Sequence, residues 1–382
     1  MEKDSIEWEK VKLGLLGDFF KGSGITKNDL VQNGLPCIRY AELYTKFDFI
    51  IPFCISFISE DTAKTAKPIR KGDILFAGSG ETKEEIGKCA VYMGYVQAYA
   101  GGDNIIFRTS KAIPLYLSFF LNTLGRKQLN KLGQGDSIVH IHSSDLKNVV
   151  IPLPPLCEQE KIAEILGTWD LAIEKLTALI EQKKLLKKGL MQRLLTGKQR
   201  LSGFSEPWKK KKLGEIADLY QPKTISQSDL SEQGYPVYGA NGFIGYYPEF
   251  NHKNWQIMIT CRGSTCGTVN RTYGPSWITG NAMVINVDKN KQIDKKFLFY
   301  CLLKDNFSSI ISGSGQPQIV RNPLAKWKIF LPPLPEQGKI ANILSKADEE
   351  IDLLTRKLSA LKEQKTGLMQ KLLTGQIRVK VA

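Results

Sequence analysis

The sequence predicts an α+β protein in which two mixed α/β domains stand in tandem. Two long antiparallel coiled-coil helices with pseudo-twofold symmetry are expected to separate these domains. Three observations predict this fold: the chain has 382 residues, its sequence repeats itself in order, and each copy ends in a long proline-free segment. The expected globular domains span residues 1–157 and 201–335, and the expected helical segments span residues 158–200 and 336–382.

The repeat consists of three matched segments that occur in the same order in both copies. The pairs are WEKVKLG from Trp8 and WKKKKLG from Trp208, IPLPPLCEQEKIAEIL from Ile151 and IFLPPLPEQGKIANIL from Ile329, and GLMQRLLTGKQR from Gly189 and GLMQKLLTGQIR from Gly367. The last two pairs share one offset of 178 residues, whereas the stretch between each Trp and each Pro-Pro pair barely matches. The chain therefore alternates variable globular regions with nearly identical helical regions.

Short apolar runs bounded by turn residues predict strands in both globular regions, and longer apolar runs predict helices. The expected elements are strands Gly72–Phe76, Asn104–Phe107, Gln256–Thr260 and Ala282–Asn286, and helices Ile113–Leu124 and Phe297–Leu303. Glycine-rich loops follow the first strand of each region, at Ala77–Gly80 and Arg262–Thr265. A second glycine pair precedes each Pro-Pro pair, at Gly133–Gly135 and Gly313–Gly315.

The segment from Glu158 to Thr196 predicts a single helix of 39 residues, roughly 58 Å long. Its apolar residues alternate at spacings of four and three, which is typical of a coiled coil. The expected contact residues are Ile162, Leu166, Trp169, Ile173 and Leu176 in the first copy, and Ile340, Leu344, Ile351 and Leu354 in the second. Gly197 and Gly375 stand where a C-cap glycine belongs. Each helix can pack against the other, which we favour, or against its own domain.

The formal charge of +15 and a pI near 9.3 indicate a polyanionic partner, although a basic surface can also serve solubility alone. Gly and Ser in a loop allow close approach to phosphate, and Arg and Gln can read base edges. Ordinary hairpin turns would explain each loop taken singly, but their recurrence in both copies favours binding. The candidate DNA contacts are Lys64, Lys67, Arg70, Ser79, Lys83 and Gln134 in the first region, and Lys223, Arg262, Ser264, Thr265, Arg271 and Gln316 in the second.

The seven cysteines have irregular spacing, which predicts free thiols in a reducing compartment rather than disulfides or a zinc module. The first ten residues lack the apolar core of a signal peptide, and no apolar run reaches the length of a membrane span. We therefore expect a cytoplasmic protein that does not contact a membrane.

No catalytic residue and no metal site are expected. The chain contains neither a Walker A loop nor a G-x-G-x-x-G loop after a strand, and it has only three histidines. His140 and His142 would face the same side of a strand, but no Cys or acidic cluster accompanies them. The set Asp73, Glu81 and Lys83 has the composition of a magnesium-dependent nuclease centre, yet the second copy carries no such set.

The three repeated segments resemble the specificity (S) subunits of type I restriction-modification enzymes over nearly the whole chain. The most specific parts are the two Trp-x-x-x-x-Leu-Gly openings, the LPPLxEQxKIAxIL elements at Leu153 and Leu331, and the GLMQ[RK]LLTG elements at Gly189 and Gly367. Two such units in the right order are more diagnostic than any single one.

The resemblance implies that each globular domain is a target recognition domain for one half of a bipartite site in double-stranded DNA. It also implies that the helices fix the gap between half-sites and dock two methyltransferase (M) subunits, which restriction (R) subunits can join. The chain itself would carry no cofactor, because S-adenosylmethionine, ATP and Mg²⁺ belong to the partner subunits. The alternatives are an orphan paralogue without a restriction role and the magnesium-dependent nuclease.

Overall fold

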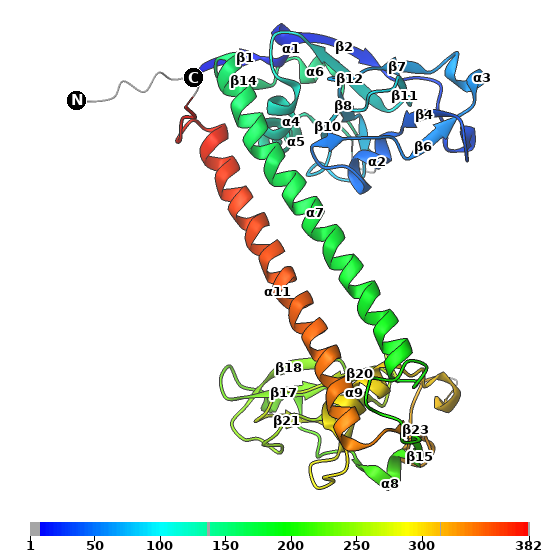
Figure 1. The fold of residues 1–382 in the computed structure, drawn as a ribbon. Helices are drawn as coiled ribbons and strands as arrows, with labels where there is room; N and C mark the ends of the chain where they lie inside the picture. Colours follow the sequence, from blue (N-terminus) through cyan, green and yellow to red (C-terminus); the bar gives the residue numbers. More distant parts are fainter. Residues whose placement is uncertain (1–7, 136–137, 314, 381–382) are drawn as a thin grey trace. The chain divides into compact units, whose positions relative to one another are not determined.

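The computed structural model describes residues 8–135, 138–313 and 315–380 (Figure 1). The chain divides into two compact units. The first unit contains the chain up to Lys175 together with the segment from Leu358 onward, and the second unit runs from Leu176 to Lys357. The long helices α7 (Leu156–Leu194) and α11 (Leu334–Leu373) each contribute one part to each unit. No helix in the described part of the chain has the length and apolar character needed to cross a membrane.

The first unit is built on a five-stranded sheet of order β2-β12-β8-β10-β5. Its strands are β2 (Gly17–Lys21), β12 (Asn104–Thr109), β8 (Ile74–Ala77), β10 (Cys89–Tyr92) and β5 (Ile50–Ile51). The second sheet, of order β3-β6-β4-β11-β7, contains β3 (Leu30–Val31), β6 (Ser56–Ile58), β4 (Leu35–Ile38), β11 (Ala98–Ala100) and β7 (Lys67–Ile69). Two short pairs complete the strands, β1 (Glu9–Lys12) with β14 (Val150–Leu153) and β9 (Ser79–Gly80) with β13 (Val139–His140).

Strand β8 is apolar at every position because the sheet is covered on both faces. Ile74 and Phe76 belong to the core cluster that contains helix α4 (Pro114–Asn122). Leu75 and Ala77 belong to the cluster that contains residues of the second sheet. The smaller helices of this unit are α1 (Leu13–Leu16), α2 (Tyr40–Thr45), α3 (Glu60–Ala63), α5 (Arg126–Leu132) and α6 (Ser143–Leu146).

The second unit repeats the central part of this architecture with fewer strands. Its main sheet has the order β16-β22-β19-β20, made of β16 (Asp218–Tyr220), β22 (Ala282–Asn286), β19 (Ile257–Thr260) and β20 (Val269–Arg271). The smaller sheets contain β17 (Tyr235–Gly239), β18 (Gly242–Tyr247) and β21 (Trp277–Ile278), and β15 (Lys209–Lys212) with β23 (Lys328–Leu331). The helices are α8 (Leu213–Ile216), α9 (Lys295–Lys304) and α10 (Arg321–Ala325). All six predicted strands and helices are confirmed within two residues at each end.

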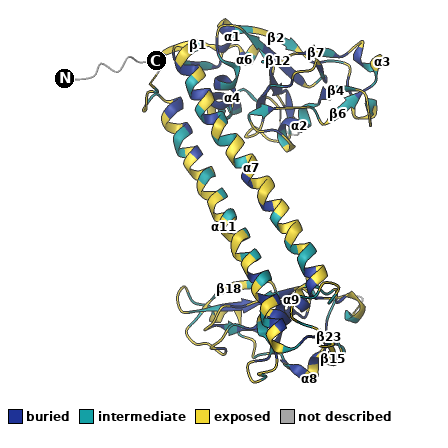
Figure 2. Cartoon of the chain, in the orientation of Figure 1, coloured by how far each residue is buried: buried dark blue, intermediate teal, exposed yellow. Residues whose placement is uncertain are grey.

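Of the predicted contact residues, those that are buried are Ile162, Leu166, Leu176, Ile340 and Leu344. The others, Trp169, Ile173, Ile351 and Leu354, are half-buried, and many remaining residues of the two helices are exposed (Figure 2). In the first unit, Ile162 and Leu166 of α7 share a core cluster with Leu372 and Leu373 of α11. In the second unit, Leu194 and Leu195, at the end of the first copy, share a core cluster with Ile340 and Leu344. Gly197 and Gly375 follow the two helices with φ of +69° and +74°, as expected for C-cap glycines. Each unit is therefore completed by the end of the other repeat's helix.

The three repeated sequence segments meet at one point in each unit. In the first unit, the Arg378 guanidinium donates two hydrogen bonds of 2.7 Å to the buried Glu158 carboxylate, and the Trp8 indole donates a third at 3.3 Å. In the second unit, Arg200 donates two bonds of 2.8 Å to the buried Glu336, and its guanidinium lies 5.8 Å from the Trp208 ring. A bidentate pair satisfies a carboxylate that would be costly to bury alone. This shared requirement explains why all three segments are retained in both copies.

Polar residues also lie within the predicted apolar rows. The Lys365 ammonium pairs with Asp170 in the first unit, and the Lys187 ammonium pairs with Asp348 in the second. Lys365 lies 4.2 Å from the centre of the Phe49 ring, and Lys187 lies 5.6 Å from that of Tyr300. Burial lowers the pKa of Lys365 and raises that of Asp170, while their pairing opposes both shifts. Apolar periodicity alone could not reveal these pairs.

Candidate nucleic-acid interface

The second unit brings two predicted loops together beside the end of β19. The loop between β19 and β20 contains Arg262, Ser264 and Thr265, all of which are exposed. The Gly263 amide donates to the Pro317 carbonyl at 3.0 Å, and the Ile319 amide donates to the Cys261 carbonyl at 2.9 Å. These bonds hold Arg262 alongside Gln318 and leave Gln316 exposed beside them. Ser314 lies outside the described residues.

A third segment, which the sequence analysis did not select, completes this surface. The Thr265 hydroxyl donates to the Asn241 side-chain carbonyl, and the Thr260 hydroxyl donates to the Ala240 carbonyl. Asn241 is exposed at the tip of the β17–β18 hairpin. An Asn-Gly pair between apolar strands is a strong hairpin signal, so Asn241-Gly242 could have indicated this tip.

The first unit contains the same arrangement of two loops. The Ile141 amide donates to the Gly78 carbonyl at 3.0 Å, as Ile319 does to Cys261. Gln134 and His140 exchange backbone hydrogen bonds of 2.9 and 2.8 Å, as Ser312 and Gln318 do in the second unit. The loop geometry is therefore repeated even though the sequences of the two globular regions barely match.

The side chains of the first-unit loops differ in exposure. Lys83 and Gln134 are exposed, whereas Ser79 is buried with its hydroxyl 3.0 Å from His140 Nδ1. Ser79 and His140 line a pocket of about 180 Å³ together with Phe19. Of the predicted first-unit contacts, the structure therefore brings Ser79 and Gln134 together around His140, and the exposed Lys83 belongs to the loop that follows Ser79.

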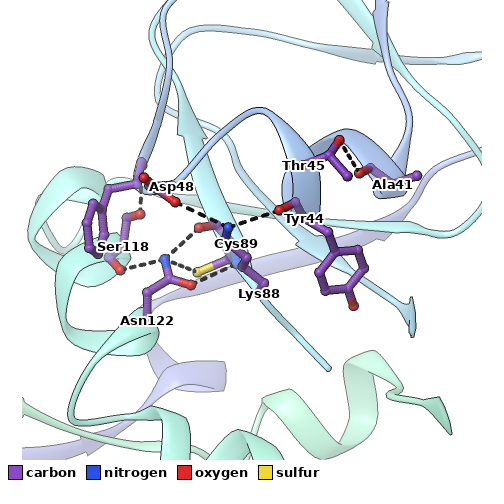
Figure 3. Close-up of polar contacts among 9 residues, drawn as sticks. Ala41, Tyr44, Thr45, Asp48, Lys88, Cys89, Ser118 and Asn122 are labelled. Carbon is purple, nitrogen blue, oxygen red and sulfur yellow. Dashed lines mark hydrogen bonds and ion pairs between the residues drawn. The ribbon is translucent and has the colours of Figure 1, made fainter. Parts of the chain in front are cut away.

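Contacts with helix α4 hold the start of β10, where the loop between β8 and β10 ends (Figure 3). The Asn122 side chain donates to the Cys89 carbonyl at 2.6 Å and accepts from the Cys89 amide at 3.1 Å. The Lys88 ammonium lies 3.3 Å from the Asp48 carboxylate, and the Ser118 hydroxyl donates to the Phe49 carbonyl at 2.8 Å. This network fixes β10 where it leaves the loop.

Arg126 supports the middle of the same loop. Its guanidinium donates to the carbonyl oxygens of Glu84 and Ile86 at 2.7 and 2.8 Å. Burial lowers the pKa of Arg126, and these carbonyls supply part of the polar environment that it loses from water. The position of Lys83 is therefore set by contacts of its neighbours, while its own side chain stays exposed.

The remaining predicted contacts lie apart from the loop tips. Lys67 and Arg70 line a separate groove, and Lys64 forms an ion pair of 2.7 Å with Asp61 on α3. Arg271 pairs with Ile257 at the end of the β19–β20 hairpin opposite to its loop. Lys223 is exposed, and its carbonyl accepts a hydrogen bond of 3.3 Å from the Trp277 indole.

Asp73, the first of the three residues of the alternative nuclease centre, forms an ion pair with Arg108. Its carboxylate is buried and accepts two hydrogen bonds of 2.7 Å from Arg108 and one of 2.9 Å from the Arg70 amide. Glu81 and Lys83 lie beyond β8, in the loop. In the described ranges, no three His, Cys, Asp or Glu side chains gather as a metal site would require.

The sequence model of the type I restriction modification DNA specificity domain matches this chain twice, at residues 5–183 and 205–363. The chain therefore belongs to that family, whose members recognise the DNA target of type I restriction-modification enzymes. The two matches correspond to the two copies of the repeat.

Curated relatives and solved structures agree with this assignment. The putative type I restriction enzyme MjaX specificity subunit of Methanocaldococcus jannaschii is 29% identical over 98% of this chain and 94% of its own length. The MjaVIII specificity subunit of the same organism is 29% identical over 70% of this chain and 71% of its own length. The crystal structure of a type I S subunit from M. genitalium has the same fold, with a TM-score of 0.69, 21% identity and 97% of both chains covered.

Proposed function

We propose that each unit reads one half of a bipartite target in double-stranded DNA through its glycine loops. The observation that carries this proposal is the repeated two-loop arrangement, which presents different side chains on the same backbone geometry. Reading by side chains in loops on a rigid sheet is common in binding proteins. Two such surfaces in one chain suit a target made of two separate sequences.

We propose that α7 and α11 form an antiparallel coiled coil with pseudo-twofold symmetry that sets the gap between the half-sites. In the first unit, Lys365 near the end of α11 pairs with Asp170 of α7, and Arg378, which follows α11, pairs with Glu158 at the start of α7. The matching contacts in the other unit are Arg200 with Glu336 and Lys187 with Asp348. Under this proposal, residues 1–157 and 201–335 are the recognition domains and residues 158–200 and 336–382 are the spacer.

The proposed partners are two methyltransferase subunits, which dock on the helical regions, and restriction subunits, which join them. A solved structure with a TM-score of 0.54 and 19% identity is described in terms of the complex assembly of the type I system. Under this proposal the chain is a cytoplasmic, non-catalytic subunit, and S-adenosylmethionine, ATP and Mg²⁺ belong to the partner subunits. The specificity role is favoured over a nuclease because the Asp73 carboxylate is already paired with Arg108.

The test is to express the chain with its methyltransferase subunit in a host without DNA methylation and to map the methylated bases. We expect one motif made of two short sequences at one fixed gap, and no such methylation when either protein is omitted. Methylation at unrelated sites would contradict the proposal. A confirmed complex without methylation would favour the orphan paralogue, and cleavage of DNA by the purified chain with Mg²⁺, lost in Glu81→Ala, would favour the nuclease.

A further inference from the structure

A basic groove lies in the first unit beyond the end of the β8–β10 hairpin that is opposite to the glycine loop. It has a volume of about 490 Å³. Its lining includes Phe20, Lys67, Arg70, Lys71, Tyr95 and Arg108. These residues come from β2, β7, β12 and two turns, so the fold gathers cations from distant parts of the sequence into one surface.

The groove carries a surplus of positive charge. Arg108 forms a bidentate pair with the buried Asp73, and this pair satisfies that carboxylate. Among the described residues, none of Lys67, Arg70 and Lys71 forms an ion pair with a carboxylate. Three cations on one open surface create a positive potential that attracts a polyanion.

An exposed tyrosine stands at the edge of this groove. Tyr95 is 92% exposed, and the Lys71 ammonium lies 4.4 Å from the centre of its ring. The turn that presents Tyr95 is held by a hydrogen bond of 2.7 Å from the Tyr92 hydroxyl to the Val96 carbonyl. An aromatic ring that contributes so little to the core is free to pack against a ligand, and its hydroxyl can donate to a phosphate oxygen.

The second unit has the same feature at the equivalent position. Tyr273 follows β20 as Tyr95 follows β10, and each of these strands leads out of a glycine loop. Tyr273 is 64% exposed, and the Arg271 guanidinium lies 5.8 Å from its ring centre. The sequences around the two tyrosines differ. The pairing of an exposed tyrosine with a cation is therefore not explained by similarity between the two copies of the repeat.

We propose that the surface formed by Lys67, Arg70, Lys71 and Tyr95 binds the phosphodiester backbone of the target DNA, with Arg271 and Tyr273 as its counterpart in the second unit. This inference rests on the proposed function, in which the glycine loops read bases. The four residues of β8 span about 13 Å between groove and loop. One duplex with a helical turn of about 34 Å can contact both.

The surface fits a backbone contact better than base reading. Of its three cations that form no ion pair among the described residues, Lys67 and Lys71 are lysines, which bind phosphate as point charges, and arginine also binds phosphate through its planar fork. Contacts to phosphates position a protein on the duplex and strengthen binding to every sequence. This surface therefore contributes affinity and register, and the loops contribute sequence preference.

The test compares Lys71→Ala and Tyr95→Ala with wild type in the assembled complex with methyltransferase. Affinity for a duplex carrying the mapped target and for an unrelated duplex is measured between 50 and 300 mM KCl. We expect each variant to weaken both affinities by the same factor, roughly five-fold to ten-fold, and Lys71→Ala to reduce the slope of log K against log salt by about 1. Lys127→Ala, which removes an exposed lysine on α5, is the matched control and should change neither quantity.

Three results would overturn the inference. Unchanged affinities in both variants would show that the surface does not bind DNA. A loss of preference at one base would make it a reading surface instead. Size-exclusion chromatography could instead show that a variant loses methyltransferase from the complex, while the complex that remains binds DNA with unchanged affinity. That result would make the surface a protein docking surface. A wild-type complex that recognises no bipartite motif would instead contradict the proposed function itself.

Discussion

At the level of single residues, two glycines shape the loops that we propose to read DNA. Gly135 and Gly313 have φ of +105° and +94°, a region that side chains with a Cβ atom rarely adopt. A Cβ atom at Gly135 would stand 2.3 Å from the Ile138 carbonyl oxygen, and one at Gly313 would stand 2.4 Å from that of Gln316. The second loop of each unit therefore requires glycine at this position.

At the same scale, we expect the Arg262 side chain to contact a base of one half-site. Its exposed side chain lies in the loop that contacts both Gln318 and the β17–β18 tip. Because a bidentate contact to a base is worth about 1–3 kcal/mol, Arg262→Ala should relax the preference at one base of one half-site by roughly ten-fold to a hundred-fold. Methylation mapping of the variant complex measures this preference at both half-sites.

The matched control is Lys291→Ala, which removes an exposed cation from the segment between β22 and α9. It should leave the preferences of both half-sites unchanged. Uniform weakening by Arg262→Ala across all sequences would instead make Arg262 a phosphate contact.

At the scale of elements, each long helix serves two cores. The start of α7 packs in the first unit and its end packs in the second, and α11 does the reverse. The leucines at the end of each repeat therefore stabilise the unit whose globular region comes from the other repeat. This exchange explains why the ends of the two repeats are nearly identical, whereas the globular regions are free to diverge.

Leu373 and Leu195 test this exchange as a matched pair. Leu373 is fully buried in the core of the first unit, and Leu195, its equivalent, is 4% exposed in the core of the second. Because a Leu→Ala change in a core costs about 2–5 kcal/mol, Leu373→Ala should destabilise the first unit and Leu195→Ala the second. Hydrogen exchange of β8 and β19 reports the two units separately. Faster exchange of β19 in Leu373→Ala, with β8 unchanged, would contradict the exchange of helix ends.

The long helices and the central strands could be predicted because local patterns determine them. Continuous apolar runs predicted β8, β12, β19 and β22, and the spacing of Ile162, Leu166 and Leu176 predicted α7. The pairing of Lys365 with Asp170 and the contact of Asn241 with Thr265 depend on residues that are distant in sequence. No local pattern encodes such contacts, and for the same reason the candidate site residues separated into loop and groove groups only in the structure.

At the scale of the whole molecule, we propose that the chain presents two DNA-reading surfaces whose separation the long helices set. The repeat supplies two similar frameworks, and the variable regions supply two different sets of side chains. A target with two half-sites can then change in one half without change in the other. The gap between the halves should depend on the helices alone.

The most direct test of this account lengthens both helices together. Seven residues that continue the spacing of the apolar rows are inserted after Lys175 in α7 and after Lys357 in α11, where the two units meet along the chain. Seven residues add about 10 Å of helix, close to three base pairs, and keep the apolar rows in phase. Methylation mapping should show both half-site sequences unchanged and the gap longer by about three base pairs. An unchanged gap, in a complex that still methylates both half-sites, would contradict the claim that the helices set their separation.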